Sequence, residues 1–184
     1  MENDDAVTTT RERLIAAAAL EFREASFLGT DSNRIARRAG FAPQTFYRWF
    51  KDKIEIFIAV YRAWEDEELR SVGALLVEGA NDEPVVEAGV AHHRAWLKFR
   101  RSLRALSVEN AQVRAARAES RLRQVAWIAQ WKGPRALAAE EIAARLLQLE
   151  RLTDAIAEGE FIDMGMTEDA ARRRLVEIIF ELRR

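Results

Sequence analysis

Cysteine is absent from the 184-residue sequence, and histidine occurs only twice. The lack of cysteine excludes disulfides, thiol catalysis and thiolate metal sites. The two histidines, His92 and His93, are adjacent, a spacing that does not suit a zinc site or the Glu-x-x-His pair of a di-iron bundle. Glycine-rich phosphate loops and a nucleophile elbow are also missing. We therefore predict no metal, no cofactor and no enzymatic activity.

Other residue types and sequence features that are rare or missing indicate the fold class and the cellular location. The sequence has 8 glycines, 3 prolines and no clear alternating strands, so we predict an all-α protein. No signal peptide or transmembrane run is visible, which predicts a cytoplasmic protein without membrane contact. The formal net charge is −1, so any affinity for nucleic acid must come from a local basic patch.

One stretch does carry a recognisable pattern, DSNRIARRAGFAPQTFYRWFKDK at residues 31–53. It predicts two short helices joined by a glycine turn, with a third helix behind them. Gly40 can adopt positive φ in the turn, and Pro43 suits the first turn of the second helix. The pattern is typical of a DNA-binding helix–turn–helix, and the plainer alternative is a helical hairpin with a solvated basic face.

The second helix of this stretch has a polar face suited to nucleic acid. Phe46, Trp49 and Phe50 are expected on its inner side. Its outer side offers an amide, a hydroxyl at the border, a phenol and two cations, namely Gln44, Thr45, Tyr47, Arg48 and Lys51. Such groups suit base edges and phosphates, so we interpret this face as a recognition surface.

Capping signals predict where the neighbouring helices begin. Thr9 with Glu12 and Asp52 with Glu55 fit capping boxes, and Asp31 is suited to cap the short helix before the turn. Lys53 then lies in the first turn of a helix, where its ammonium and the free backbone N–H groups suit a phosphate.

The segment from Arg11 to Trp64 resembles the DNA-binding domain of TetR-family transcriptional regulators. The resemblance is carried by LIAAAALEF at 14–22, Phe27, IARRAG at 35–40 and TFYRWFKDK at 45–53. It implies an all-helical homodimer with an N-terminal DNA reader and a C-terminal ligand-binding and dimerisation domain. By position, it implies base or phosphate contacts at Asn33, Pro43, Gln44, Thr45, Tyr47, Arg48 and Lys53.

Two residues depart from the family pattern. Ser26 stands where the family usually has glycine, so the turn after the first helix is expected to be tight or strained. Ala42 stands where a serine or threonine often caps the recognition helix, and alanine caps poorly. Neither departure removes a group expected to face DNA.

We predict a reader at residues 1–55, with a disordered tail at 1–8, and a ligand-binding and dimerisation domain at 56–184. A long helix from Lys53 to about Val77 joins them, and the turn-rich segment GANDEP at 79–84 follows it. The next helix shows His92 on its apolar stripe, whereas His93 is offset and expected to be exposed.

Aromatic residues of the C-terminal part suggest a ligand site. We predict a pocket for a small, mostly apolar or aromatic ligand, lined by Trp64, His92, Trp96, Phe99, Trp127 and Trp131. The plainer interpretation is that each tryptophan fills the core.

The last helix is apolar over a wide arc and needs cover on two sides. Its own domain supplies one cover, and a second copy of the chain is the predicted other, as in a four-helix bundle across a two-fold axis. The predicted interface consists of Leu146, Leu149, Leu175, Ile178, Ile179 and Leu182.

The predicted function is therefore transcriptional regulation, as a repressor that binds a near-palindromic operator and is released by a small ligand. Two alternatives stay open. One is a DNA-binding dimer of the same fold that answers to a protein partner or to no effector. The other is a helical interaction protein whose reader has lost DNA binding.

Overall fold

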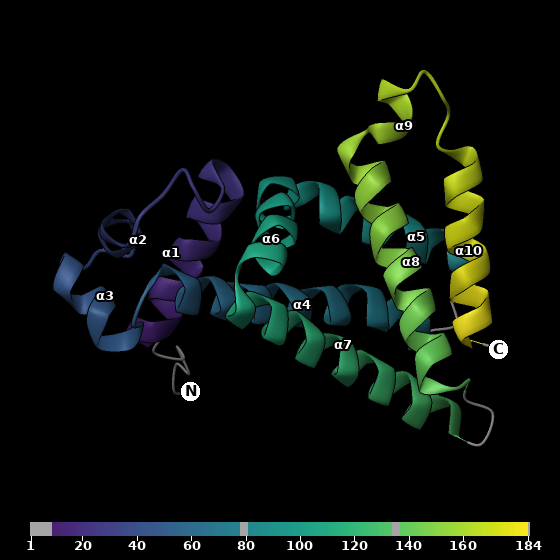
Figure 1. Cartoon of the computed structure of the whole chain (residues 1–184), viewed down its shortest axis with the longest axis horizontal. Coiled ribbons are helices and arrows are strands. Elements are labelled where there is room, and N and C mark those ends of the chain that lie inside the picture. The colour runs from purple at the N-terminus through teal and green to yellow at the C-terminus, as the bar shows by residue number, and fades with distance from the viewer. Residues whose placement is uncertain (1–8, 78–80, 134–136, 184) are drawn as a thin grey trace, which may run out of the picture. The chain divides into compact units, whose positions relative to one another are not determined.

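The computed structural model of the chain describes residues 9–77, 81–133 and 137–183, with only the backbone described for 72–77. Over these residues it contains ten helices and no strand (Figure 1). This confirms the predicted all-α class. The predicted disordered tail at 1–8 and residues 79–80 of the predicted turn lie outside the described residues.

The chain divides into two compact units between Trp64 and Glu65. The predicted division, after residue 55, fell nearer the start of the same helix, α4 (Lys53–Val77). Residues of α4 therefore belong to both units. Among the helices described, none is long and apolar enough to cross a membrane.

The N-terminal unit comprises α1 (Thr10–Ala25), α2 (Ser32–Arg38), α3 (Pro43–Trp49) and the first half of α4. Predicted caps set the starts of α1 and α2. The Thr9 hydroxyl accepts from the Glu12 backbone N–H at 3.2 Å, and the Glu12 carboxylate accepts from the Thr9 N–H at 2.7 Å. Asp31 accepts from the Arg34 N–H at 2.8 Å. Each carboxylate or hydroxyl satisfies a backbone donor that the helix itself leaves unpaired.

The cap of α4 differs in one detail from the prediction. Asp52 accepts from the Glu55 N–H at 2.9 Å, as expected. The Glu55 carboxylate, however, accepts from the N–H of Lys51 at 2.6 Å, one residue earlier than in a capping box. It therefore fastens the chain that leaves α3.

An aromatic cluster closes the core of this unit. Phe57 packs edge-on against Phe22 and Phe27, with ring centroids 5.1 and 5.3 Å apart. Ile35 of α2 and Phe46 of α3 are also fully buried. Each apolar stripe predicted for α1, α2 and α3 thus supplies side chains that hold the helix–turn–helix in place.

The C-terminal unit contains the rest of α4 and six further helices: α5 (Asp82–Ala95), α6 (Leu97–Glu109), α7 (Ala111–Lys132), α8 (Ala139–Glu158), α9 (Glu160–Asp163) and α10 (Asp169–Arg183). Helices α8 and α10 run side by side in opposite directions, with α9 in the turn between them (Figure 1). Gly159 ends α8 at φ 80°, the left-handed conformation that glycine adopts without a steric penalty.

The wide apolar arc of α10 is covered on both sides by its own chain. Leu175 and Ile179 pack in a cluster with residues of α5 and α8. Ile178 and Leu182 pack in a second cluster with residues of α7 and α8, including Leu146. Leu149 is half-buried against both clusters.

Most residues of the predicted dimer interface are therefore core residues of the single chain. Leu146, Leu175, Ile178, Ile179 and Leu182 are all buried within one chain, at 9% exposure or less. The sequence showed the width of the arc but not that both covers come from α5, α7 and α8. Leu149 alone of the predicted set is still partly exposed, and the dimer interface itself stays a prediction.

The structure also corrects the predicted histidine pattern. The single helix expected through His92 and Trp96 is broken at Trp96, which has φ −117° and ψ 25°, into α5 and α6. His93, expected to be exposed, is 3% exposed, and His92 is half-buried. Val86, Val90 and His93 are buried within α5, so the buried stripe of this helix lies one residue further along than the predicted stripe through His92.

Candidate nucleic-acid interface

Helix α3 presents the predicted polar face to solvent. Gln44, Tyr47, Arg48 and Lys51 are exposed, Tyr47 by 58%, and Thr45 is partly buried at the border. Phe46 and Phe50 on the opposite side are buried, at 0% and 2% exposure. The sequence pattern therefore gave the correct outer face of this helix.

Trp49 is the exception on α3. It was expected on the inner side with Phe46 and Phe50, but it is 46% exposed. Helix α3 ends at Trp49, and Phe50 already has an extended backbone. With the helix ending there, the Phe50 ring is buried and the Trp49 side chain stays partly exposed.

The start of α3 has no side-chain cap. Ala42 occupies the N-cap position and Pro43 follows it in the first turn. This confirms the expectation drawn from Ala42. The uncapped N–H groups at the start of a helix are donors suited to a phosphate oxygen.

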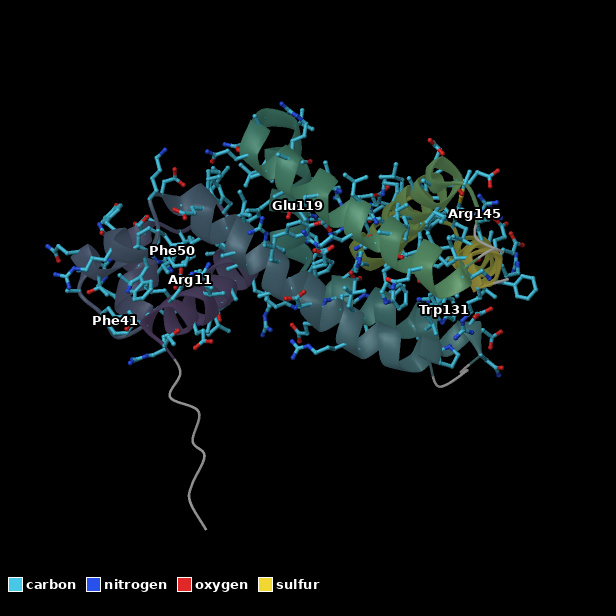
Figure 2. All side chains as sticks on the ribbon, turned by 90° about the horizontal axis from the view of Figure 1, so that it is seen from below. Arg11, Phe41, Phe50, Glu119, Trp131 and Arg145 are labelled. Atoms are coloured by element: carbon cyan, nitrogen blue, oxygen red, sulfur yellow. The ribbon has the colours of Figure 1, made fainter. Side chains whose placement is uncertain are left out.

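Arg13 of α1 braces the turn before α3, a role the sequence did not reveal. Its Nη2 donates to the Ala39 carbonyl at 2.9 Å, and its guanidinium lies 4.5 Å from the centre of the Phe41 ring. Gly40 between them has φ 79°, and a Cβ there would lie 3.1 Å from Nη2. Arg11 is similarly placed over Phe50 at 5.3 Å (Figure 2). Both arginines of α1 therefore support aromatic side chains next to α3.

Lys53 is turned into the N-terminal unit. Its Nζ donates to the carbonyls of Phe27 and Thr30 at 2.8 and 2.9 Å and lies 4.1 Å from the Phe27 ring centre. Burial lowers the pKa of Lys53. The ammonium therefore ties the turn after α1 to the start of α4. The contact of Lys53 with a DNA phosphate stays a prediction, and it would use the third N–H of the ammonium group.

Several cations of the basic segment are engaged by carboxylates. Arg38 pairs with Glu21 at 3.0 Å and with Glu24 at 2.6 Å, and these hydrogen bonds raise the pKa of Arg38. Arg34 approaches Glu21 at 3.3 Å. Arg34 and Arg38 are thus partly neutralised by carboxylates, which concentrates the candidate interface on α3. Asn33 at the start of α2 is exposed, and Pro43 is partly buried.

The predicted ligand-site tryptophans come from different elements of the chain. Trp64, at 3% exposure, stacks on Tyr61 in the N-terminal unit. Trp96 packs edge-on against fully buried Phe99, with centroids 5.6 Å apart. Trp127 and Trp131 stack in parallel on α7, 6.0 Å apart, and are 43% and 48% exposed. The indoles of α7 are thus the predicted lining residues that a ligand reaches most readily.

The comparison with protein families identifies the N-terminal region. Residues 14–60 match the family described as "Bacterial regulatory proteins, tetR family". Residues 14–60 are thus a TetR-family domain. The match spans α1 to the first turns of α4 and includes the whole exposed face of α3.

Solved structures extend the likeness in fold to nearly the whole chain. A transcriptional regulator from Rhodococcus sp. Rha1 has a TM-score of 0.68 at 17% identity, over 95% of this chain and 96% of that one. A Mesorhizobium loti protein assigned provisionally to the TetR family has a TM-score of 0.64 at 20% identity, over 94% of both chains. The fatty acid degradation regulator FadR from Bacillus halodurans has a TM-score of 0.62 at 15% identity, over 92% of this chain and 93% of that one. A search of curated proteins finds no match.

Proposed function

We propose that this TetR-family regulator binds a near-palindromic DNA operator as a homodimer, with α3 of each copy in a major groove. The observation that carries the proposal is the exposed face of α3, where the amide of Gln44, the phenol of Tyr47 and the guanidinium of Arg48 lie opposite buried Phe46. Exposed Lys51 adds a second cation just beyond the end of the helix. Recognition helices of such dimers enter grooves one helical turn apart, about 34 Å.

Binding to genomic fragments, chiefly those upstream of the gene and its neighbours, tests this proposal in gel shifts at fixed salt. We expect Arg48→Ala to weaken specific binding by ~1–3 kcal/mol if Arg48 reads a base. Arg62→Ala is the matched control, because Arg62 is an exposed arginine on α4 outside the α3 face. Equal operator affinity in the wild type and both variants would contradict the assignment of α3.

For the dimer, we propose an interface on the outward face of α8 and α10. Leu147 on α8 is 55% exposed and Phe180 on α10 is 53% exposed. Arg145 on α8 (Figure 2) and Glu181 on α10 pair at 2.7 Å on these helices. An apolar patch rimmed by ion pairs is a common composition for an interface between copies.

Light scattering of charge-insertion variants tests the dimer. Leu147→Arg and Phe180→Arg are expected to give folded monomers, because both side chains are exposed within one chain. Leu175→Arg is expected to unfold the C-terminal unit instead, because Leu175 is 1% exposed in its core. A wild type that is monomeric at micromolar concentration would refute the proposed interface.

We further propose that the protein is a repressor released by a small, mostly apolar or aromatic ligand, which stacks on Trp127 and Trp131. The two exposed indoles support this choice, since stacking on an aromatic ligand adds to area burial. A coupling free energy of only ~1–3 kcal/mol between ligand and DNA is needed. A thermal-shift and tryptophan-fluorescence screen tests it, with Trp127→Ala as the variant expected to lose the response.

The alternative is a dimer that answers to a protein partner or to no effector. An aromatic and apolar library that changes neither melting temperature nor fluorescence would favour this alternative.

A further inference from the structure

A network of charged side chains occupies the interior of the C-terminal unit. Arg100 of α6 and Asp154 of α8 are each 2% exposed. Arg100 holds Asp154 through two hydrogen bonds, Nε to Oδ1 at 3.1 Å and Nη2 to Oδ2 at 2.9 Å, and its Nη2 also donates to Glu150 at 2.6 Å. Buried charges are costly unless they are paired and hydrogen-bonded, so these side chains are held in fixed positions.

His93 of α5 lies between two carboxylates in this network. Its Nδ1 is 2.8 Å from Asp154 Oδ1, and its Nε2 is 2.9 Å from Glu68 Oε1. An ionised carboxylate only accepts hydrogen bonds, whereas a neutral imidazole has a single N–H. Both contacts are satisfied together only if the ring carries a proton on each nitrogen. The geometry therefore describes an imidazolium that joins α4 to α8.

The other charged groups near the His93 ring determine which of its two contacts, with Asp154 or with Glu68, is lost when the ring loses a proton. Asp154 is paired with Arg100 and also lies 2.8 Å from Nη1 of Arg104 on α6. Glu150 is held by Arg117 at 2.8 Å and by Arg121, both on α7. The ion pair described for Glu68 is with His93, with the charges of Arg100 and His92 nearby. Asp154 thus has two arginine partners besides the His93 ring. Glu68 depends more than Asp154 does on its contact with the ring.

Burial opposes the charge on His93, but the hydrogen bonds to Asp154 and Glu68 outweigh it and raise the pKa of His93. Burial likewise opposes the charge on Glu68, and the hydrogen bond from His93 outweighs it, so the pKa of Glu68 is lowered. These directions agree with an imidazolium between two carboxylates.

We propose that His93 is a proton-dependent latch that holds the second half of α4 to α8 through Glu68 and Asp154. When the ring loses a proton, one N–H remains for Asp154, and a nitrogen lone pair then faces the Glu68 carboxylate. The contact with α4 changes from attraction to repulsion. Residues of α4 belong to both units. A change of pH that weakens the contact between α4 and α8 therefore acts on a helix that the two units share. The latch does not depend on α3 binding DNA.

The sign of the pH effect follows from the raised pKa of His93. The hold is complete below the ordinary histidine pKa of 6.5 and is lost as pH rises through the pKa of the buried ring. Between these two pKa values, the equilibrium constant that favours the contact between His93 and Glu68 falls by up to about tenfold for each pH unit.

Nitrogen-15 NMR of the histidine rings tests the protonation state directly. His92→Gln leaves His93 as the one histidine of the full chain, so its signals need no assignment. We expect both ring nitrogens to be protonated at pH 7, with a titration above pH 6.5. Glu68→Gln is expected to lower the His93 pKa by about one unit or more, a tenfold loss of proton affinity. A neutral ring at pH 7 in the wild type would overturn the proposal.

Hydrogen exchange of α4 tests the latch itself, in the wild type and in Glu68→Gln. The amides of residues 65–71 are expected to lose protection with rising pH in the wild type, beyond the ordinary base catalysis of exchange. The amides of α10 serve as the internal reference. In Glu68→Gln the extra loss is expected to disappear, because a neutral amide is not repelled by the lone pair. The same pH profile in both proteins would refute the latch.

Discussion

Replacing Ser26 with glycine should stabilise the N-terminal unit. Ser26 ends α1 at φ 66° and ψ 177°, and it is the one residue other than glycine with positive φ among those described. Such a conformation costs a residue with a Cβ about 1–3 kcal/mol. Glycine removes that strain but adds about 0.5–1 kcal/mol of chain entropy to be lost on folding. The expected net gain is about 0.5–2 kcal/mol.

Thermal unfolding followed by circular dichroism measures this gain. For a unit of this size, each 1 kcal/mol raises Tm by roughly 4–8 °C. Ser26→Ala is the matched control, because alanine also loses the hydroxyl but keeps the Cβ, so it should give no such gain. Gly29→Ala in the same turn should act in the opposite direction, since its Cβ would lie 2.0 Å from the Ala25 carbonyl oxygen. Equal Tm values for Ser26→Gly and the wild type would refute the argument from backbone strain.

Further predictions concern caps and buried charges. Ala42→Ser should raise stability by about 0.5–2 kcal/mol by capping α3, measured by urea denaturation, and no gain would show that the cap geometry is unsuitable. Lys53→Met should lower the free energy of unfolding by about 1–3 kcal/mol, because the hydrogen bonds to the two carbonyls are lost. If the same variant leaves the salt dependence of DNA binding unchanged, Lys53 does not contact a phosphate. Arg100→Met should cost about 3–5 kcal/mol in the same assay, because Asp154 and Glu150 lose a buried partner. Although burial raises it, the pKa of Glu150 is lowered to about 2 by Arg100, Arg117 and Arg121. Its stabilisation should therefore be complete above pH 4.5 and be lost as pH falls towards 2, and an Arg100→Met variant with the same acid profile as the wild type would contradict this assignment.

The helix–turn–helix was predictable because its signals are local. Asp31 caps α2, Gly40 turns the chain and Phe46 points inward, and each depends on neighbours within a few residues. The strain at Ser26 and the missing cap at Ala42 were visible for the same reason, as departures from a pattern with known geometry. The contacts of Arg13 and Lys53 were not visible, since they reach 23 to 26 residues along the chain.

The C-terminal unit was predicted less well because its packing is long-range. His93, and not His92, is buried, with its ring bonded to Glu68 of α4 and Asp154 of α8, and periodicity within α5 cannot show such contacts. The covers of α10 came from α5 and α7, which periodicity in α10 alone cannot show.

One signal in the sequence did point to the buried network. Glu150, Asp154 and Glu158 recur at intervals of four residues along one side of α8. Arginines recur at the same interval on α6, at 100 and 104, and on α7, at 117 and 121. Complementary stripes of opposite charge on three helices indicate helices that face one another, and in this chain they do.

The proposal that α3 reads DNA is tested most directly by selecting bound sequences from random duplex DNA at fixed salt. We expect the wild type to enrich an inverted repeat with half-sites about one helical turn apart. Arg48→Ala and Gln44→Ala should each relax the preference at symmetric positions of that repeat, while the remaining positions are still enriched. Failure of the wild type to enrich any sequence, or an identical repeat for both variants, would contradict the account.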